Sequence, residues 1–143
     1  SLALPASVAA APEGAHFYCC GPVPMLEAFE AACAGLDPAR VHLEYFAAKE
    51  APATEGGFVV HLARSGRTIP IAAGCTILDA LQASGVAVPS SCQQGVCGIC
   101  ETAVLAGVPD HRDLVLSEQE RAAGRTIMIC CSGATSAELT LDL

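Results

Sequence analysis

Three cysteines within nine residues constrain this chain more than any other feature of its sequence. They stand at Cys92, Cys97 and Cys100 in a C-x4-C-x2-C arrangement, and Cys130 follows after a gap of 29 residues. This order is typical of the ligands of a plant-type [2Fe-2S] centre, in which four thiolates hold two bridged irons. The sequence therefore predicts that these four cysteines bind such a cluster.

The residues between the cysteines are small or polar, as a loop wrapped around a cluster requires. Gly95 and Gly98 can adopt positive φ angles and let the backbone approach closely, so that backbone N–H groups can point at the sulfurs. We therefore expect both glycines to belong to the site. Further polar donors are Ser90, Ser91, Gln93 and Gln94.

The fourth ligand has to be chosen between two adjacent cysteines, Cys130 and Cys131. The apolar residues 126–129 predict a strand that runs into Cys130. Neighbouring residues on a strand point to opposite faces, so only one of the two thiols would reach the cluster. We assign Cys130 to the cluster and interpret Cys131 as a small packed residue.

A structural zinc site uses the same thiolate ligands and is the main alternative. Its cysteines usually come as two close pairs, whereas Cys130 stands apart from the other three. A disulfide framework is disfavoured, because nine cysteines cannot all pair and 143 residues can bury a core without such links. Unpaired thiols point to a reducing compartment, which we take to be the cytoplasm.

The charge of the chain and its first residues exclude several classes. The formal net charge is −8 and the pI is about 4.8, which argues against nucleic acid and fits a positively charged docking partner. The apolar start has no basic region, is interrupted by Pro5, and is too short to cross a membrane. Because no initiator methionine is present, we expect the chain to begin inside a longer protein.

Residues 1–46 predict a strand, a helix and a second strand. The strands are expected at 16–19 and 41–46, and the helix is expected between Pro22 and Gly35. A β-α-β piece cannot cover both faces of a parallel sheet, so it is expected to be the end of a larger α/β domain. Residues 47–56 have the composition of a linker.

Residues 57–143 predict a small mixed sheet clasped by a helix, which is an α+β arrangement of the β-grasp type. Capping boxes are expected at Thr76 with Asp79 and at Ser117 with Glu120. Residues 107–113 predict a charged turn, in which Arg112 either pairs locally or faces a partner. Strands are expected at 57–64, 67–71, 101–105, 126–130 and 138–142, and helices at 77–84 and from Ser117 to Gly124.

Other chemistry is not indicated by the sequence. There is no glycine-rich phosphate loop and no arrangement of a nucleophile with a base. The histidines at 16, 42 and 61 fall in predicted strands without ligand spacing, so we interpret them as ordinary strand residues. We therefore expect no catalytic residue in this chain.

Two groups of residues together resemble one known family. Residues 57–143 resemble the C-terminal ferredoxin domain of the phthalate dioxygenase reductase and vanillate O-demethylase reductase family, including the stretch from Gly107 to Asp113. Residues 16–46 are similar to the end of that family's NAD(H)-binding domain. The matching motifs there are Cys20-Gly21-Pro22 and Glu44-Tyr45-Phe46. The resemblance covers nearly the whole chain, although a free-standing ferredoxin after unrelated sequence stays open.

The resemblance implies a relay in which NADH reduces FMN and single electrons pass through the [2Fe-2S] cluster to a Rieske-type oxygenase. Cys20, Gly21 and Pro22 would line the nicotinamide side of the flavin site, and Phe46 would pack near the flavin ring. The family's FMN domain and the front of its nucleotide domain have no counterpart in these residues. We therefore expect this chain alone to carry electrons without oxidising NADH.

Overall fold

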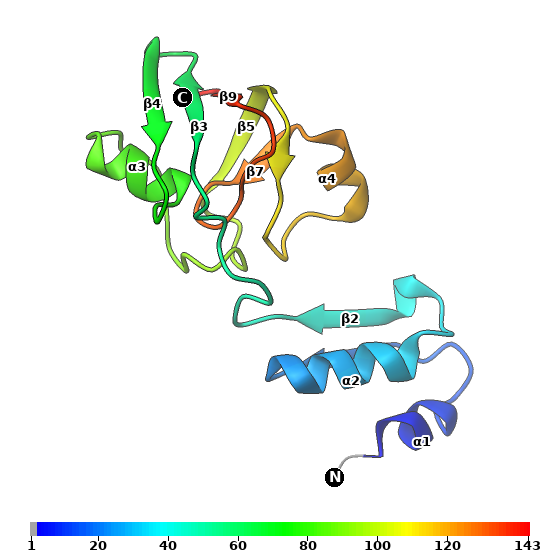
Figure 1. Cartoon of the computed structure of the whole chain (residues 1–143). Helices are drawn as coiled ribbons and strands as arrows, with labels where there is room; N and C mark the ends of the chain where they lie inside the picture. Colours follow the sequence, from blue (N-terminus) through cyan, green and yellow to red (C-terminus); the bar gives the residue numbers. More distant parts are fainter. Residues whose placement is uncertain (1–2) are drawn as a thin grey trace. The chain divides into compact units, whose positions relative to one another are not determined.

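The computed structural model describes residues 3–143 and divides the chain into two compact units, residues 1–47 and 48–143. Each unit has its own secondary structure and is described separately (Figure 1). No helix in residues 3–143 has the length and apolar character needed to cross a membrane.

The first unit is built around two parallel strands joined by a helix. Strand β1 (Phe17–Cys20) pairs in register with β2 (Val41–Glu44), and α2 (Val23–Cys33) connects them (Figure 1). A short helix α1 (Leu4–Ala9), which the sequence did not predict, packs against α2, and the 3-10 turn η1 (Pro38–Arg40) precedes β2. The predicted strand–helix–strand order is therefore confirmed.

Helix α2 forms because its apolar residues recur at helical spacing. Leu26, Phe29 and Cys33 are all buried and lie on one face of the helix. Pro22 is the N-cap, and a proline in the first turn loses no helical hydrogen bond.

The second unit contains a five-stranded sheet in the order β4-β3-β9-β5-β7. β3 and β9 are parallel, and every other neighbouring pair is antiparallel. Helices α3 and α4 lie at the two sides of this sheet in Figure 1. The elements of the sheet and its helices are β3 (Phe58–Leu62), β4 (Arg67–Ile71), α3 (Ile77–Ala83), β5 (Glu101–Ala106), α4 (Glu118–Ala123), β7 (Thr126–Met128) and β9 (Glu138–Leu141).

The core of the second unit comes from the alternating side chains of the strands and one face of α3. Phe58, Val60 and Leu62 of β3 are buried, as are Leu139 and Leu141 of β9. Burial of an aliphatic side chain of this size contributes about 1.5–3 kcal/mol to the free energy of unfolding. The side chains from α3 are Ile77, Leu78 and Leu81. This core fixes the ends of α3 and β5, between which the cysteine loop runs.

Both capping boxes predicted from the sequence are present. The Thr76 hydroxyl accepts from the Asp79 N–H, and the Asp79 carboxylate accepts from the Thr76 N–H. Ser117 and Glu120 make the equivalent pair at α4. Gly124 ends α4 in the left-handed conformation, as the sequence indicated.

Two local predictions differ from the structure. The strand expected at 126–130 ends at Met128, and residues 129–131 form a turn. The charged turn expected at 107–113 contains the two-residue strand β6 (Pro109–Asp110), which pairs with β8 (Gly133–Ala134). Both differences arise from contacts between residues far apart in the chain, which local patterns do not reveal.

Candidate metal centre

The cysteine loop, residues 85–100, joins α3 to β5 without a helix or strand (Figure 1). Gln93, Gly95 and Gly98 in this loop have φ angles of 54°, 67° and 77°. Residues with positive φ reverse the direction of the backbone, so successive N–H groups can point into the same space. The loop therefore has the backbone form that an anionic, sulfur-bound group requires.

Gly95 occupies the tightest position in the cysteine loop. A Cβ atom there would lie 2.4 Å from the Cys131 Sγ and 3.0 Å from the Asp113 Cα. The Leu114 N–H donates to the Gly95 carbonyl at 2.8 Å. Gly98 is less confined, because its Cβ would meet the Val115 Cγ1 at 3.5 Å. Only Gly95 therefore needs glycine for space as well as for its φ angle.

The first two cysteines form one pair. The Cys97 thiol lies close enough to the Cys92 sulfur to affect its pKa, and the Gln94 N–H donates to that sulfur at 3.3 Å. Partial burial raises the pKa of Cys92, but the N–H groups of Gln94, Val96 and Cys97 and the Cys97 thiol outweigh it and lower the pKa to about 7. This sulfur is therefore stabilised as a thiolate, the form that binds metals.

Cys100 and Cys130 form the second pair, and both are buried. The neighbouring Cys130 thiol raises the pKa of Cys100, as burial also does. The Cys100 thiol lowers the pKa of Cys130, but the Cys131 thiol and burial raise it to about 11. The Gly95 N–H acts in the opposite direction and lowers the pKa of Cys130. Two distant parts of the chain therefore bring these two sulfurs together.

The strand argument used to choose between the adjacent cysteines is wrong, because β7 ends before either residue. Cys130 and Cys131 are both buried and lie in the turn after the strand. The two residues differ in what they contact. Cys130 lies next to the Cys100 thiol, whereas the Cys131 Sγ lies 3.8 Å from the Ser132 Oγ and against Gly95. The bond from Cys130 lowers the pKa of Cys131. These contacts support Cys130 as the ligand.

The structure places the four predicted ligands as two neighbouring pairs, Cys92 with Cys97 and Cys100 with Cys130. Within residues 3–143 it does not bring three histidine, cysteine or acidic side chains to metal-binding spacing. The donors are all sulfur, and backbone N–H groups already point at the sulfurs of Cys92 and Cys130. A cluster held by four thiolates fits this donor set, because N–H···S bonds stabilise the added negative charge.

The other predicted site residues lie at one edge of the first unit. Cys20 pairs with Glu44 at the carboxyl ends of β1 and β2, so Gly21, Pro22 and Phe46 follow at the same edge. Cys20 is exposed, and Phe46 is 68 % exposed. A cavity of about 680 Å³ is lined here by Tyr18, Cys19, Cys20, Val41, His42, Leu43 and Glu44.

Arg112 is paired within the chain. Its Nη2 lies 2.8 Å from the Asp110 Oδ2 and 3.6 Å from the Glu55 Oε1, and both acids raise its pKa. Of the two predicted readings, local pairing is the one that the geometry supports. Asp113 instead turns inward and is buried. Sequence reasoning missed this acid, because it is of the same residue type as the half-buried Asp110 on the other side of Arg112.

Comparison with known proteins decides the family. Residues 60–135 match the model of the 2Fe-2S iron-sulfur cluster binding domain. The chain belongs to this family. The prediction of a 2Fe-2S ferredoxin-like, β-grasp domain is therefore confirmed, as is the resemblance to reductases of the phthalate dioxygenase and vanillate O-demethylase type.

Two relatives show how the chain aligns with longer proteins. It is 93 % identical over 143 residues to the phenoxybenzoate dioxygenase subunit beta of Ectopseudomonas oleovorans, covering 100 % of this chain and 45 % of the relative. It is 44 % identical over 129 residues to the phthalate dioxygenase reductase of Burkholderia cepacia, covering 90 % of this chain and 39 % of that protein. The chain thus spans less than half the length of these relatives.

Solved structures also align with this chain over only part of their own length. A structure of phthalate dioxygenase reductase superposes with a TM-score of 0.73 at 40 % identity, over 100 % of this chain and 44 % of that one. An intact type IV self-sufficient cytochrome P450 monooxygenase gives a TM-score of 0.83 at 44 % identity, over 100 % of this chain and 19 % of that one. The β-α-β unit followed by the ferredoxin-like unit therefore recurs within longer redox proteins.

Proposed function

We propose that this chain transfers electrons through a [2Fe-2S] cluster held by Cys92, Cys97, Cys100 and Cys130. The observation that carries the proposal is the C-x4-C-x2-C loop with positive φ angles, in which a backbone N–H donates to the Cys92 sulfur, within residues that match the 2Fe-2S cluster binding domain. Two bridged irons need two thiolates each, so one pair would serve each iron. The cluster, when bound, takes up and releases one electron at a time.

The residues of this chain stabilise the charge on the sulfurs and limit the access of water. The N–H groups of Gln94, Val96 and Cys97 favour the charged form of the Cys92 sulfur, and burial shields Cys100 and Cys130. Hydrogen bonds to sulfur and burial are the main determinants of the reduction potential of such centres, which for plant-type ferredoxins lies near about −400 mV. Gly95 and Gly98 serve the site by allowing this backbone path.

Electrons would leave at the exposed side of the loop. Cys97 is exposed, and Ile99 and Val115 beside it are 52 % and 38 % exposed. Gly98 lies between Cys97 and Ile99 and faces Val115, so these residues share one surface. An apolar surface next to a redox centre suits a partner that must approach closely.

The intact protein is proposed to be an NADH- and FMN-dependent reductase that supplies a Rieske-type aromatic-ring oxygenase or O-demethylase. Residues 1–46 would be the end of its NAD(H)-binding domain, 47–56 a linker, and 57–143 the ferredoxin domain. Cys20, Gly21, Pro22 and Phe46 would contact nicotinamide or flavin, since ligands of parallel sheets bind at the carboxyl ends of the strands. All nine cysteines are free, which supports a reducing, cytoplasmic location.

Metal and sulfide analysis of anaerobically reconstituted protein tests this proposal. We expect two irons and two sulfides per chain, with visible absorption that bleaches on addition of dithionite. Each of four serine variants, Cys92→Ser, Cys97→Ser, Cys100→Ser and Cys130→Ser, should lose this signal. Cys131→Ser is the matched control and should keep it. A colourless protein that binds one zinc ion would refute the proposal in favour of a zinc-stabilised interaction module.

A second measurement separates this chain from the intact reductase. NADH should not reduce the cluster of this chain unless a flavoprotein is added. Rapid reduction by NADH alone would contradict the assignment of nicotinamide and flavin chemistry to a longer protein.

A further inference from the structure

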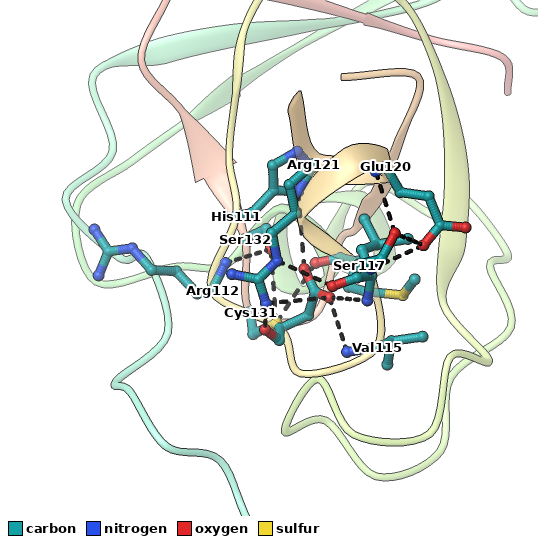
Figure 2. Close-up of polar contacts among 11 residues, drawn as sticks. His111, Arg112, Val115, Ser117, Glu120, Arg121, Cys131 and Ser132 are labelled. Carbon is teal, nitrogen blue, oxygen red and sulfur yellow. Dashed lines mark hydrogen bonds and ion pairs between the residues drawn. The ribbon is translucent and has the colours of Figure 1, made fainter. Parts of the chain in front are cut away.

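Behind the cysteine loop lies a group of buried polar side chains with no role in the proposed electron transfer. His111 and Arg121 both approach Asp113, and Figure 2 shows the Arg112 side chain pointing away from them. The Asp113 side chain is 0 % exposed and that of His111 is 9 % exposed. Buried charges are expensive unless they are paired, so this group requires an explanation.

Asp113 organises the turn that follows it. Its Oδ2 accepts from the Val115 N–H at 3.0 Å and from the Leu116 N–H at 2.8 Å. Its Oδ1 is buried and has no hydrogen-bond partner among the described residues. The Nδ1 of His111 lies 3.8 Å from this atom, just beyond hydrogen-bond range. Both ring nitrogens of His111 are buried and have no hydrogen-bond partner within residues 3–143.

Arg121 holds the same turn from the side of α4. Its Nε donates to the Leu116 carbonyl at 3.2 Å, and its Nη2 donates to the Asp113 carbonyl. The same Nη2 lies 3.9 Å from the Asp113 Oδ2, so the guanidinium also compensates the buried carboxylate. The Asp113 carboxylate and the Arg121 guanidinium therefore fix the turn of residues 113–116 through hydrogen bonds at both of its ends.

This turn supports the cysteine loop directly. The Leu114 N–H donates to the Gly95 carbonyl, the Asp113 Cα lies against Gly95, and the Val115 Cγ1 faces Gly98. Both glycines of the loop thus rest on residues that Asp113 and Arg121 hold in place. The position of the loop determines where its N–H groups point relative to the thiols.

We propose that Asp113 is a positioning residue for the cysteine loop, and that Arg121 keeps its buried carboxylate in place. The inference rests on the proposed cluster site. Groups that orient metal ligands from outside typically affect metal affinity by roughly 10–100-fold when they are removed. The structure thus assigns a role in cluster retention and in reduction potential to residues that bind no iron.

Three variants test the proposal: Asp113→Ala, Asp113→Asn and Arg121→Gln. We expect the rate of cluster loss to a chelator to rise roughly 10–100-fold in Asp113→Ala. Asp113→Asn, which keeps an oxygen for the two N–H groups, should lose the cluster more slowly than the alanine variant. The reduction potential should shift in every variant that takes up the cluster. Asp110→Asn is the control, because it removes the same charge from the same segment at a part-exposed side chain, and it should behave like the parent.

Hydrogen exchange in the cluster-free chain provides an independent measurement. The Leu114 N–H should lose protection in Asp113→Ala and Arg121→Gln, since its bond to Gly95 depends on the turn. If Asp113→Ala does not fold, Asp113→Asn and Arg121→Gln decide. The proposal would be overturned if the variants kept the cluster lifetime and the reduction potential of the parent. It would also be overturned if the cluster lifetime fell only as much as the free energy of unfolding fell, while the reduction potential stayed unchanged. A parent chain that takes up no cluster would instead refute the proposed function.

Discussion

Replacement of Gly95 by alanine tests how tightly the cysteine loop is packed. The φ angle of 67° disfavours any residue with a Cβ by about 1–2 kcal/mol. The new methyl group would also meet the Cys131 Sγ at 2.4 Å, and such overpacking costs about 1–3 kcal/mol. Alanine lowers the entropy of the unfolded chain, which offsets about 0.4–1 kcal/mol. We therefore expect Gly95→Ala to reduce the free energy of unfolding by about 2–4 kcal/mol.

Gly98→Ala is the matched control for this prediction. Its φ angle of 77° gives the same backbone strain, but its Cβ would meet the Val115 Cγ1 at an ordinary contact distance of 3.5 Å. The free energy of unfolding should therefore fall by only about 1 kcal/mol, which is the backbone strain minus the entropic gain from alanine in the unfolded chain. The comparison separates the effect of space from the effect of backbone conformation.

Urea unfolding of the cluster-free chain, followed through amide NMR signals of the second unit, measures both losses. A double variant with Cys131→Ala removes the sulfur that the new methyl group would touch. We expect it to restore about 1–2 kcal/mol relative to the sum of the two single variants, a coupling of the size seen for residues in contact. If Gly95→Ala costs no more than Gly98→Ala, or if the coupling is absent, the packing argument is wrong.

Three further predictions follow from other contacts. Thr76→Ala should lower the free energy of unfolding by about 1 kcal/mol, because α3 loses its N-cap, whereas Thr76→Ser should not. Hydrogen bonds from the Ser117 N–H and hydroxyl lower the pKa of Glu120. The Glu120 carboxylate therefore stabilises the fold above its ordinary pKa of 4.5, and this stabilisation is lost as the pH falls through the pKa of Glu120 in the folded protein. Thermal unfolding of Glu120→Gln should therefore differ from the parent less at about pH 3 than at about pH 6. Ile99→Asp should slow electron delivery to the proposed oxygenase partner roughly tenfold at unchanged potential, and the similarly exposed Leu105 at the far end of β5 supplies the control, Leu105→Asp.

The sequence revealed those parts of the fold that depend on neighbours along the chain. The capping residues of α3 and α4 satisfy N–H groups three positions away, so their pattern is visible locally. Strand β3 was recognisable because its buried residues alternate. The short pairing of β6 with β8 and the early end of β7 were missed, because both depend on segments brought together by folding.

The candidate site shows the same division. Spacing alone pointed to four cysteines, and it could not reveal that they lie as two neighbouring pairs or that backbone N–H groups lower the pKa of Cys92. Asp110 precedes Arg112 by two residues and Asp113 follows it directly, and the sequence does not show which of them pairs with it. In the fold Asp110 pairs with Arg112 at the surface, whereas Asp113 is buried against the cysteine loop.

The sequence by itself determined the chemistry of this protein, since thiol number and spacing specify which metal group a loop can hold. It also determined most of the helices and strands, because helix caps and alternating strands act over a few residues, whereas α1, β6 and β8 were not predicted. Only the tertiary structure decided which cysteine of the adjacent pair meets Cys100 and which acid supports the loop. The physical reason is that burial and long-range contacts are set by the packing of whole elements, which no short stretch of sequence contains.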